Sequence, residues 1–216
     1  MNDLQYDYTA KELQKLCKKM PLKWGMVQND DVDFKIDLFS CHTMTDLLSE
    51  INSLSANEQQ YFVRRWFMWK CAAVDEYIFS KDPNVLANPN QKDQDWDIEF
   101  NKKIRFDVKG TVIPRSMRKT FDLSQEEKLV QYYYNKQSSG VRHNIQNRIF
   151  IVHHSYRAEA RSLYLRCHWS LKEKAYQAFN QRLTQANINL ISYKSVLAKC
   201  IFIFETSENE FIFKIN

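Results

Sequence analysis

Residues 56–80 constrain the fold more than any other segment, because they predict a long helix that is apolar around most of its circumference. The apolar positions of this segment are Phe62, Val63, Trp66, Phe67, Met68, Cys71, Ala73, Val74, Tyr77 and Phe79. A helix with so wide an apolar surface lies buried at the centre of a domain. We expect it to end near Asp82-Pro83, because proline restricts the conformation of the residue before it.

The composition of the 216 residues agrees with a domain that has a substantial core, since 44% of them are hydrophobic. Disordered and collagen-like classes are therefore excluded. With only 3 Gly and 4 Pro, an all-β sandwich with many turns and a Gly-rich nucleotide loop are both disfavoured. No apolar run approaches the roughly 20 residues of a membrane span, and the polar start of the chain is unlike a signal peptide.

The five cysteines are scattered, and none lies in a CxxC pair or at zinc-finger spacing from a histidine. Because their number is odd, they cannot form a complete set of disulfides. We expect reduced, partly buried thiols in a cytoplasmic protein.

Hydrophobic periodicity divides the chain into alternating helices and strands. Helices are predicted over residues 9–20, 43–53, 124–136 and 157–185, in addition to 56–80. Strands are predicted over residues 32–40, 95–100, 104–112 and 148–154, followed by a terminal hairpin that turns at Ser207-Glu208-Asn209. A loop is predicted over residues 83–94. This order predicts an α/β fold, bordering on α+β, with a central mixed sheet flanked by helices. Residues 1–55 form an N-terminal helical appendage in this interpretation, and residues 56–216 form the main domain.

The hairpin over residues 95–112 is unusually acidic. Asp95, Asp97 and Glu99 share one face of its first strand, and Asp107 and Lys109 share one face of its second strand, because side chains alternate with a period of two. Facing residues of a hairpin lie about 5 Å apart. Asp97, or Asp95 in another register, is therefore expected to lie beside Asp107 and Lys109.

Two carboxylates in contact repel each other unless a cation lies between them or one of them stays protonated. Oxygen ligands of this kind suit Mg²⁺, which takes few protein ligands because water and phosphate complete its octahedron. Such an ion promotes the attack of water on phosphorus. A lysine on the same face can position the water or neutralise the developing charge, so the hairpin contains the groups needed to hydrolyse a phosphodiester bond.

The triplet of an acid, any residue and lysine is weak evidence alone, because it occurs three times in the chain. Its copies begin at Asp33, Asp107 and Glu126. Only the copy at Asp107 follows a strand with an acid ten residues earlier, and only this copy is followed at once by Gly110.

In this chain Asp97 is followed, after nine residues, by Asp107-Val108-Lys109 on the next strand. This pattern resembles the PD-(D/E)xK nuclease superfamily, which includes type II restriction endonucleases. The resemblance covers about residues 56–155. It implies a restriction-endonuclease-like core: a helix, a three-stranded meander, a second helix and a further strand. It also implies that Glu76 and the backbone carbonyl of Val108 join Asp97 and Asp107 at the metal. The sequence departs from the family pattern because Trp96 stands where proline is usual, and Asp107 stands where glutamate is commoner.

The resemblance implies a Mg²⁺-dependent endonuclease of the restriction, repair, recombination or transposition class, with Mn²⁺ as a substitute. DNA is favoured over RNA as its substrate. Many nucleases of this type act as dimers, so a homodimer is a further expectation, and no membrane partner is expected.

Residues 101–150 contain 11 Lys/Arg and 4 Asp/Glu, and such a basic stretch attracts a polyanion. The candidate phosphate contacts in it are Arg115, Arg118, Lys119, Lys136, Arg142 and Arg148. The alternative functions are a non-catalytic module of the same fold that binds nucleic acid or protein, and an unrelated α/β protein with a coincidental hairpin.

Overall fold

The computed structural model describes residues 1–18, 30–90, 93, 95–136, 145–158 and 161–216. Their helices are α1 (Asp3–Cys17), α2 (Asp30–Asp33), α3 (Met44–Ile51), α4 (Ala56–Phe79), η1 (Leu123–Gln125), α5 (Glu126–Lys136), α6 (Arg161–Tyr164), η2 (Leu165–Cys167) and α7 (Trp169–Thr184). Their strands are β1 (Val85–Ala87), β2 (Ile98–Phe100), β3 (Ile104–Val112), β4 (Arg148–Ser155), β5 (Ile191–Tyr193), β6 (Val196–Glu205) and β7 (Phe211–Lys214). The expected mixed α/β architecture is thereby confirmed.

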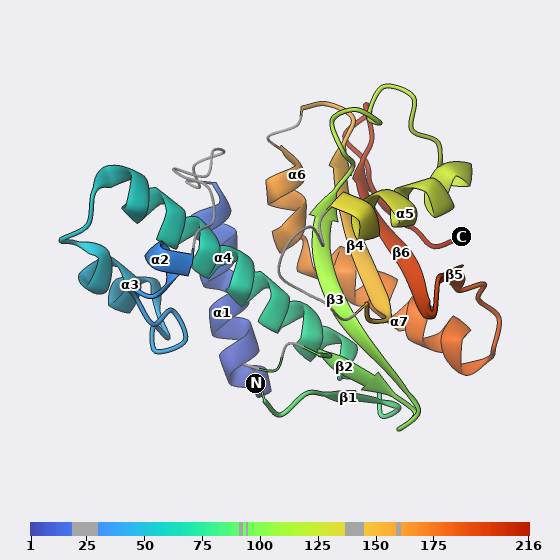
Figure 1. The fold of residues 1–216 in the computed structure, drawn as a ribbon, viewed down its shortest axis with the longest axis horizontal. Coiled ribbons are helices and arrows are strands. Elements are labelled where there is room, and N and C mark those ends of the chain that lie inside the picture. The colour runs from blue at the N-terminus through green and yellow to red at the C-terminus, as the bar shows by residue number, and fades with distance from the viewer. Residues whose placement is uncertain (19–29, 91–92, 94, 137–144, 159–160) are drawn as a thin grey trace.

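The strands form one mixed sheet in the order β1-β2-β3-β4-β6-β5, and β7 also pairs with β6. β1, β2 and β3 form an antiparallel meander, whereas β4 runs parallel to both β3 and β6. Helices cover both faces of the sheet, with α5 on one side and α4 and α7 on the other (Figure 1). β4 is buried along its whole length, as expected of a strand covered on both faces.

Two apolar cores lie on the two faces of this sheet. One contains Ile149 and Ile151 together with residues of α1, α4 and α7, and the other contains Phe150 and Val152 together with residues of α5. The first core also includes Tyr6 and Leu13 of α1, so the predicted appendage packs on the main domain. The boundary at residues 55 and 56 stays a prediction.

Helix α4 forms where the sequence predicts it. Ser55 is its N-cap, and Ser55 and Glu58 form a reciprocal capping box, which satisfies backbone donors that the first turn leaves without partners. Tyr61, Trp66 and Phe67 on this helix are almost completely buried. The helix ends before Asp82-Pro83, as predicted, and this places Glu76 in its last turn.

Several other predictions are wrong in detail. Residues 32–40 form no strand but continue from α2 into turns, and the predicted helix over 157–185 is divided into α6, η2 and α7. The loop over 83–94 contains the short strand β1, and α1 begins at an Asn2 cap rather than at Thr9. The predicted end of that first helix at Pro21 lies outside the described residues. The terminal hairpin is confirmed as β6 and β7.

The segment from β2 to β3 positions the acidic residues. Ile98 pairs with Phe106, and Glu99 pairs with Arg105. The connecting turn is possible because Asn101 and Lys102 adopt positive φ angles of 51° and 54°, and a positive φ is more tolerable for asparagine than for most residues. β3 is much longer than β2, so its C-terminal half extends beyond its pairing with β2.

Within the described residues, no helix combines the length and apolar character needed to cross a membrane.

Candidate functional site

Asp107 is the buried centre of the acidic group that the sequence predicts. It is 2% exposed, and its Oδ1 lies 2.5 Å from the ammonium nitrogen of Lys109. Its other oxygen, Oδ2, accepts a hydrogen bond of 3.0 Å from Nε of Arg148. A buried carboxylate is costly unless it is paired, and here two cations on neighbouring strands hold it in one orientation.

Asp97 lies directly before β2, and the register of the hairpin places it opposite Asp107. Its backbone nitrogen still donates to the carbonyl of Phe106, at 2.9 Å. Its side-chain Oδ2 accepts a hydrogen bond of 2.6 Å from the backbone nitrogen of Val108 and lies 4.0 Å from Nζ of Lys109. The carboxylate therefore takes the position that a strand carbonyl would occupy, and pairing between β2 and β3 ends there.

The backbone of β3 adds a further oxygen to this place. In an extended strand, the N–H and C=O of one residue point to the same side. The nitrogen of Val108 points at Asp97, whereas the nitrogen of Asp107 points the other way, toward Asn147. The carbonyl of Val108 thus faces the same edge of β3 as the carboxylate of Asp97, as the family resemblance implies.

Glu76 completes the group from the last turn of α4. Its pKa is raised from 4.5 to about 8, mainly by burial and then by the neighbouring carboxylates of Asp97, Asp75 and Asp107, against an opposing effect from Lys109. The pKa of Asp97 is raised to about 6, mainly by burial and also by Asp107, while Lys109 opposes the shift. Carboxyl groups from three elements therefore share one partly buried region in which they repel one another.

Asp95 does not belong to this group. It is exposed, and its Oδ1 accepts a hydrogen bond of 3.0 Å from the side-chain amide of Gln146. Between the two alternatives that the sequence left open, the register of the hairpin selects Asp97.

The chemistry of the donor set suits a hard divalent cation. Two carboxylates and a backbone carbonyl are oxygen ligands of the type that Mg²⁺ takes. Burial raises the pKa of Asp97, and Lys109 offsets this rise only in part. The part of the chain that the structure describes contains no group of three or more His, Cys, Asp or Glu side chains arranged to hold a metal ion. Mg²⁺ would therefore depend on Asp97, Asp107 and the carbonyl of Val108, and a contribution from Glu76 stays a prediction.

The basic residues predicted to contact phosphate differ in their surroundings. Arg115, Lys119 and Lys136 are exposed, whereas Arg118 is partly buried and donates to the carbonyl of Ile113 at 2.8 Å. Arg142 lies outside the described residues.

The expectation for Arg148 needs correction, because this side chain is 5% exposed and holds Asp107. Its guanidinium lies 5.2 Å from the ring centre of Tyr134. Arg148 therefore positions the acidic group and is not placed to meet a nucleic-acid backbone. No spacing along the chain indicates this contact, because strand pairing alone brings Arg148 beside Asp107.

A buried polar network, which the sequence analysis missed, anchors the helix that carries Glu76. Asp75 accepts hydrogen bonds from Nζ of Lys172 at 2.6 Å and from the hydroxyl of Tyr176 at 2.9 Å. Lys172 is completely buried. These bonds connect α4 to α7 at the residue next to Glu76, and so they fix the end of α4 relative to the sheet.

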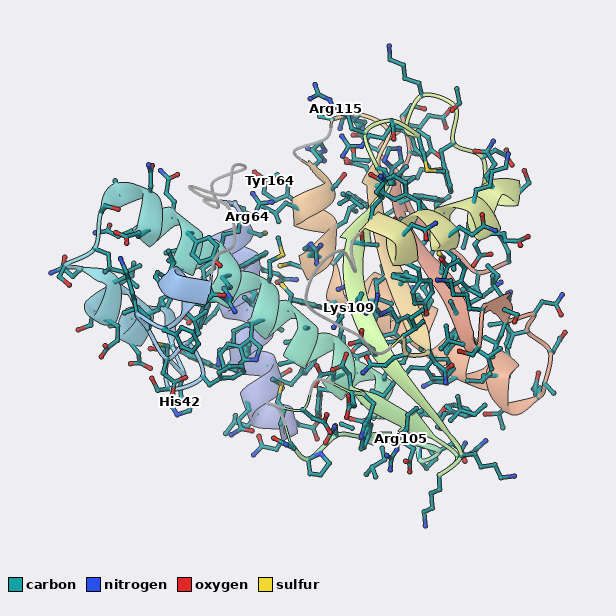
Figure 2. All side chains as sticks on the ribbon, viewed as in Figure 1. His42, Arg64, Arg105, Lys109, Arg115 and Tyr164 are labelled. Carbon is teal, nitrogen blue, oxygen red and sulfur yellow. The ribbon has the colours of Figure 1, made fainter. Side chains whose placement is uncertain are left out.

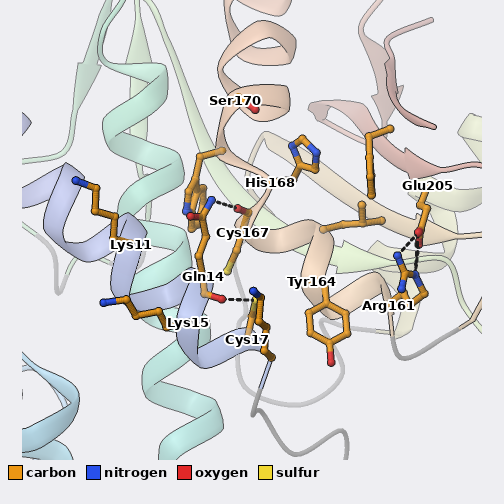
Figure 3. Close-up of a pocket in the computed structure, with 14 residues that line it drawn as sticks. Lys11, Gln14, Lys15, Cys17, Arg161, Tyr164, Cys167, His168, Ser170 and Glu205 are labelled. Atoms are coloured by element: carbon orange, nitrogen blue, oxygen red, sulfur yellow. Dashed lines mark hydrogen bonds and ion pairs between the residues drawn. The ribbon is translucent and has the colours of Figure 1, made fainter. Parts of the chain in front are cut away.

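A separate pocket of about 490 Å³ lies between α1 and the segment from α6 to α7 (Figure 3). Its wall is stabilised by a hydrogen bond from Gln14 to the carbonyl of Cys167, and by the ion pair of Arg161 with the buried Glu205. None of the residues of the acidic group lines it.

Comparisons with protein-family models, with curated proteins and with solved structures found no match for this chain.

Proposed function

We propose that this protein is a Mg²⁺-dependent endonuclease of the PD-(D/E)xK type that hydrolyses phosphodiester bonds in DNA. The observation that carries the proposal is the convergence of Asp97, Asp107 and Lys109 at one edge of β3, with Lys109 in contact with Asp107 and 4.0 Å from Asp97. Glu76 reaches the same region from α4.

The arrangement of the elements also supports a restriction-endonuclease-like core. α4 is followed by the antiparallel meander of β1, β2 and β3, then by α5, and then by β4 parallel to β3. This is the order of helix, meander, helix and strand that the resemblance implies. A fold can host many functions, so the proposal depends on the acidic group rather than on the order of elements.

The residues of the group would have separate roles. A bound Mg²⁺ would supply positive charge for the phosphate oxygens and increase the acidity of a nearby water. Asp97, Asp107 and the carbonyl of Val108 would hold the ion, and Arg148 would keep Asp107 in place. Lys109, whose side chain is 36% exposed, would orient the attacking water or neutralise charge that develops on the phosphate.

A plasmid-nicking assay in Mg²⁺ tests the proposal. We expect the wild-type protein to cleave, and we expect Lys109→Met to lower the rate by about 10²- to 10³-fold, the usual cost of removing one group that stabilises developing charge. The matched control is Lys128→Met, because Lys128 is exposed on α5 and belongs to another copy of the acid-x-Lys triplet. Mn²⁺ is expected to substitute for Mg²⁺.

Two results would contradict the proposal. One is the absence of Mg²⁺-dependent cleavage of plasmid or linear DNA by the wild-type protein, and the other is equal activity of the Lys109 and Lys128 variants. DNA binding without cleavage would favour the alternative of a non-catalytic binding module on the same fold.

A further inference from the structure

The edge of β3 that meets Asp97 also meets an arginine. Nη2 of Arg166, in η2, donates a hydrogen bond of 2.9 Å to the carbonyl of Gly110. Val108 and Gly110 are two residues apart, so their polar groups face the same edge at a separation of about 6.6 Å, given a strand rise of about 3.3 Å per residue. Asp97 and Arg166 therefore occupy neighbouring positions along one strand edge.

Gly110 is the feature that allows the guanidinium to lie so close to the strand. A side-chain Cβ at this position would collide with Nη1 of Arg166 and lie 3.3 Å from its Cζ. The strand conformation at Gly110 itself is available to other residues, so the space taken by Arg166 is what excludes a side chain here. The guanidinium of Arg166 thus takes the space beside Gly110, directly after Lys109.

The hydrogen-bond partner of Arg166 differs from the partners of the buried lysines. Lys172 is paired with Asp75, and Lys199 with Glu126. Among the described residues, Arg166 instead donates to a neutral main-chain carbonyl. Arg64 of α4 lies close enough for its charge to repel that of Arg166, and this repulsion adds to burial in lowering the pKa of Arg64. Two guanidinium groups therefore concentrate positive charge near the edge of β3 where Arg166 meets Gly110.

We infer that Arg166 and Arg64 form a binding site for a phosphate of the substrate strand, next to the phosphate that is cleaved. This inference rests on the proposed function, because the nuclease interpretation explains why a nucleic-acid strand would pass the edge of β3. Guanidinium groups bind phosphate oxygens through parallel hydrogen bonds. Arg64 is carried by α4 and Lys109 by β3 (Figure 2), and these two elements pack against each other.

The salt dependence of DNA binding tests this site without any need for cleavage. Binding of a fluorescein-labelled oligonucleotide would be measured by anisotropy in EDTA at several salt concentrations. Each phosphate contact contributes about 0.9 to the slope of log K against log[salt] for duplex DNA, and about 0.7 for a single strand. We expect Arg64→Ala together with Arg166→Ala to reduce the slope by that amount, because the two arginines share one phosphate, and Arg166→Ala alone to reduce it in the same direction.

Arg182→Ala is the matched control, because Arg182 also donates to a main-chain carbonyl, that of Ile215, at 2.6 Å. We expect it to leave the slope unchanged. Gly110→Ala provides a second test, since it displaces the guanidinium but keeps both arginines and every acidic residue. It should reduce the slope in the same direction as Arg166→Ala.

Three results would overturn the inference: no binding of DNA by the wild-type protein, a wild-type slope in both Arg166→Ala and Gly110→Ala, or equal losses in the Arg166 and Arg182 variants. The two results on the slope can be distinguished from failure of the proposed function. If the variants have altered slopes but the wild-type protein does not cleave DNA, the phosphate site is supported and the nuclease proposal is contradicted. If the wild-type protein cleaves DNA but the variants keep the wild-type slope, the nuclease proposal is supported and the phosphate site is contradicted.

Discussion

Replacing Glu76 by glutamine tests the acidic group through protein stability, independently of any activity. The pKa of Glu76 is raised from 4.5 to about 8 in the folded protein, so between these pH values the native state holds a proton that the unfolded state has lost. The free energy of unfolding must then fall as the pH rises through this window and level off above it. Glutamine has no proton to lose, so Glu76→Gln removes this part of the pH dependence.

The expected size follows from the shift. At about 1.36 kcal/mol per pKa unit, a rise from 4.5 to about 8 corresponds to a destabilisation of about 5 kcal/mol above pH 8. Solvent screens the partly exposed Glu76, and its repulsion with Asp97 affects the titration of both groups. We therefore expect a smaller difference in the free energy of unfolding, of about 2 kcal/mol, between the variant and the wild-type protein at pH 9. Near pH 5 the two proteins should differ little.

Urea unfolding at pH 5, 7 and 9 in EDTA measures this difference. Glu127→Gln is the control, because Glu127 is exposed on α5, on the other face of the sheet, and this variant should keep the wild-type pH dependence. If the stabilities of wild-type protein and Glu76→Gln change in parallel from pH 5 to 9, Glu76 does not share a buried region with Asp97 and Asp107, and the reasoning about the site fails.

Two more predictions concern the ion and the support of α4. Mg²⁺ at about 100 times its dissociation constant should stabilise the wild-type protein by about 2.7 kcal/mol, which is measured as a rise in melting temperature. Asp107→Asn should abolish this rise, and an equal rise in both proteins would exclude Asp107 as a ligand. Lys172→Met leaves Asp75 buried without its cation, so it should cost about 3–5 kcal/mol in urea unfolding. The exposed Lys174→Met should cost little, and similar losses in the two variants would show that the ion pair does not anchor α4.

Local sequence patterns predicted the elements that position the acidic group. The apolar circumference of residues 56–80 predicts α4, and the alternating runs on either side of residues 101–103 predict the hairpin. Each depends on contacts within a few residues, which a sequence reveals directly. The choice between Asp95 and Asp97 could not be made in this way, because both lie on the same strand face. It required the register, which the turn at Asn101 and Lys102 sets.

The predicted strand over residues 32–40 shows why alternation alone is insufficient. Val32 and Leu38 are buried as the pattern suggests, but Phe34 is 88% exposed. The segment lies against α4, where the hydroxyl of Tyr61 donates to Asp33 at 2.6 Å. A strand needs a neighbouring strand for its backbone donors and acceptors, and this segment packs on a helix instead.

The end of pairing between β2 and β3 explains both the site and the limits of sequence reasoning about it. The carboxylate of Asp97 accepts a hydrogen bond from the backbone nitrogen of Val108, where the next residue of a longer β2 would otherwise accept it. The edge of β3 beyond this point is therefore available to side chains. Asp97 and Arg166 then occupy positions that a longer β2 would have filled with backbone. Arg166 follows Gly110 by 56 residues, and no periodicity or spacing connects the two. The acids could be predicted because they lie on the hairpin itself, whereas the arginine beside them is brought there only by the packing of η2 against the edge of β3.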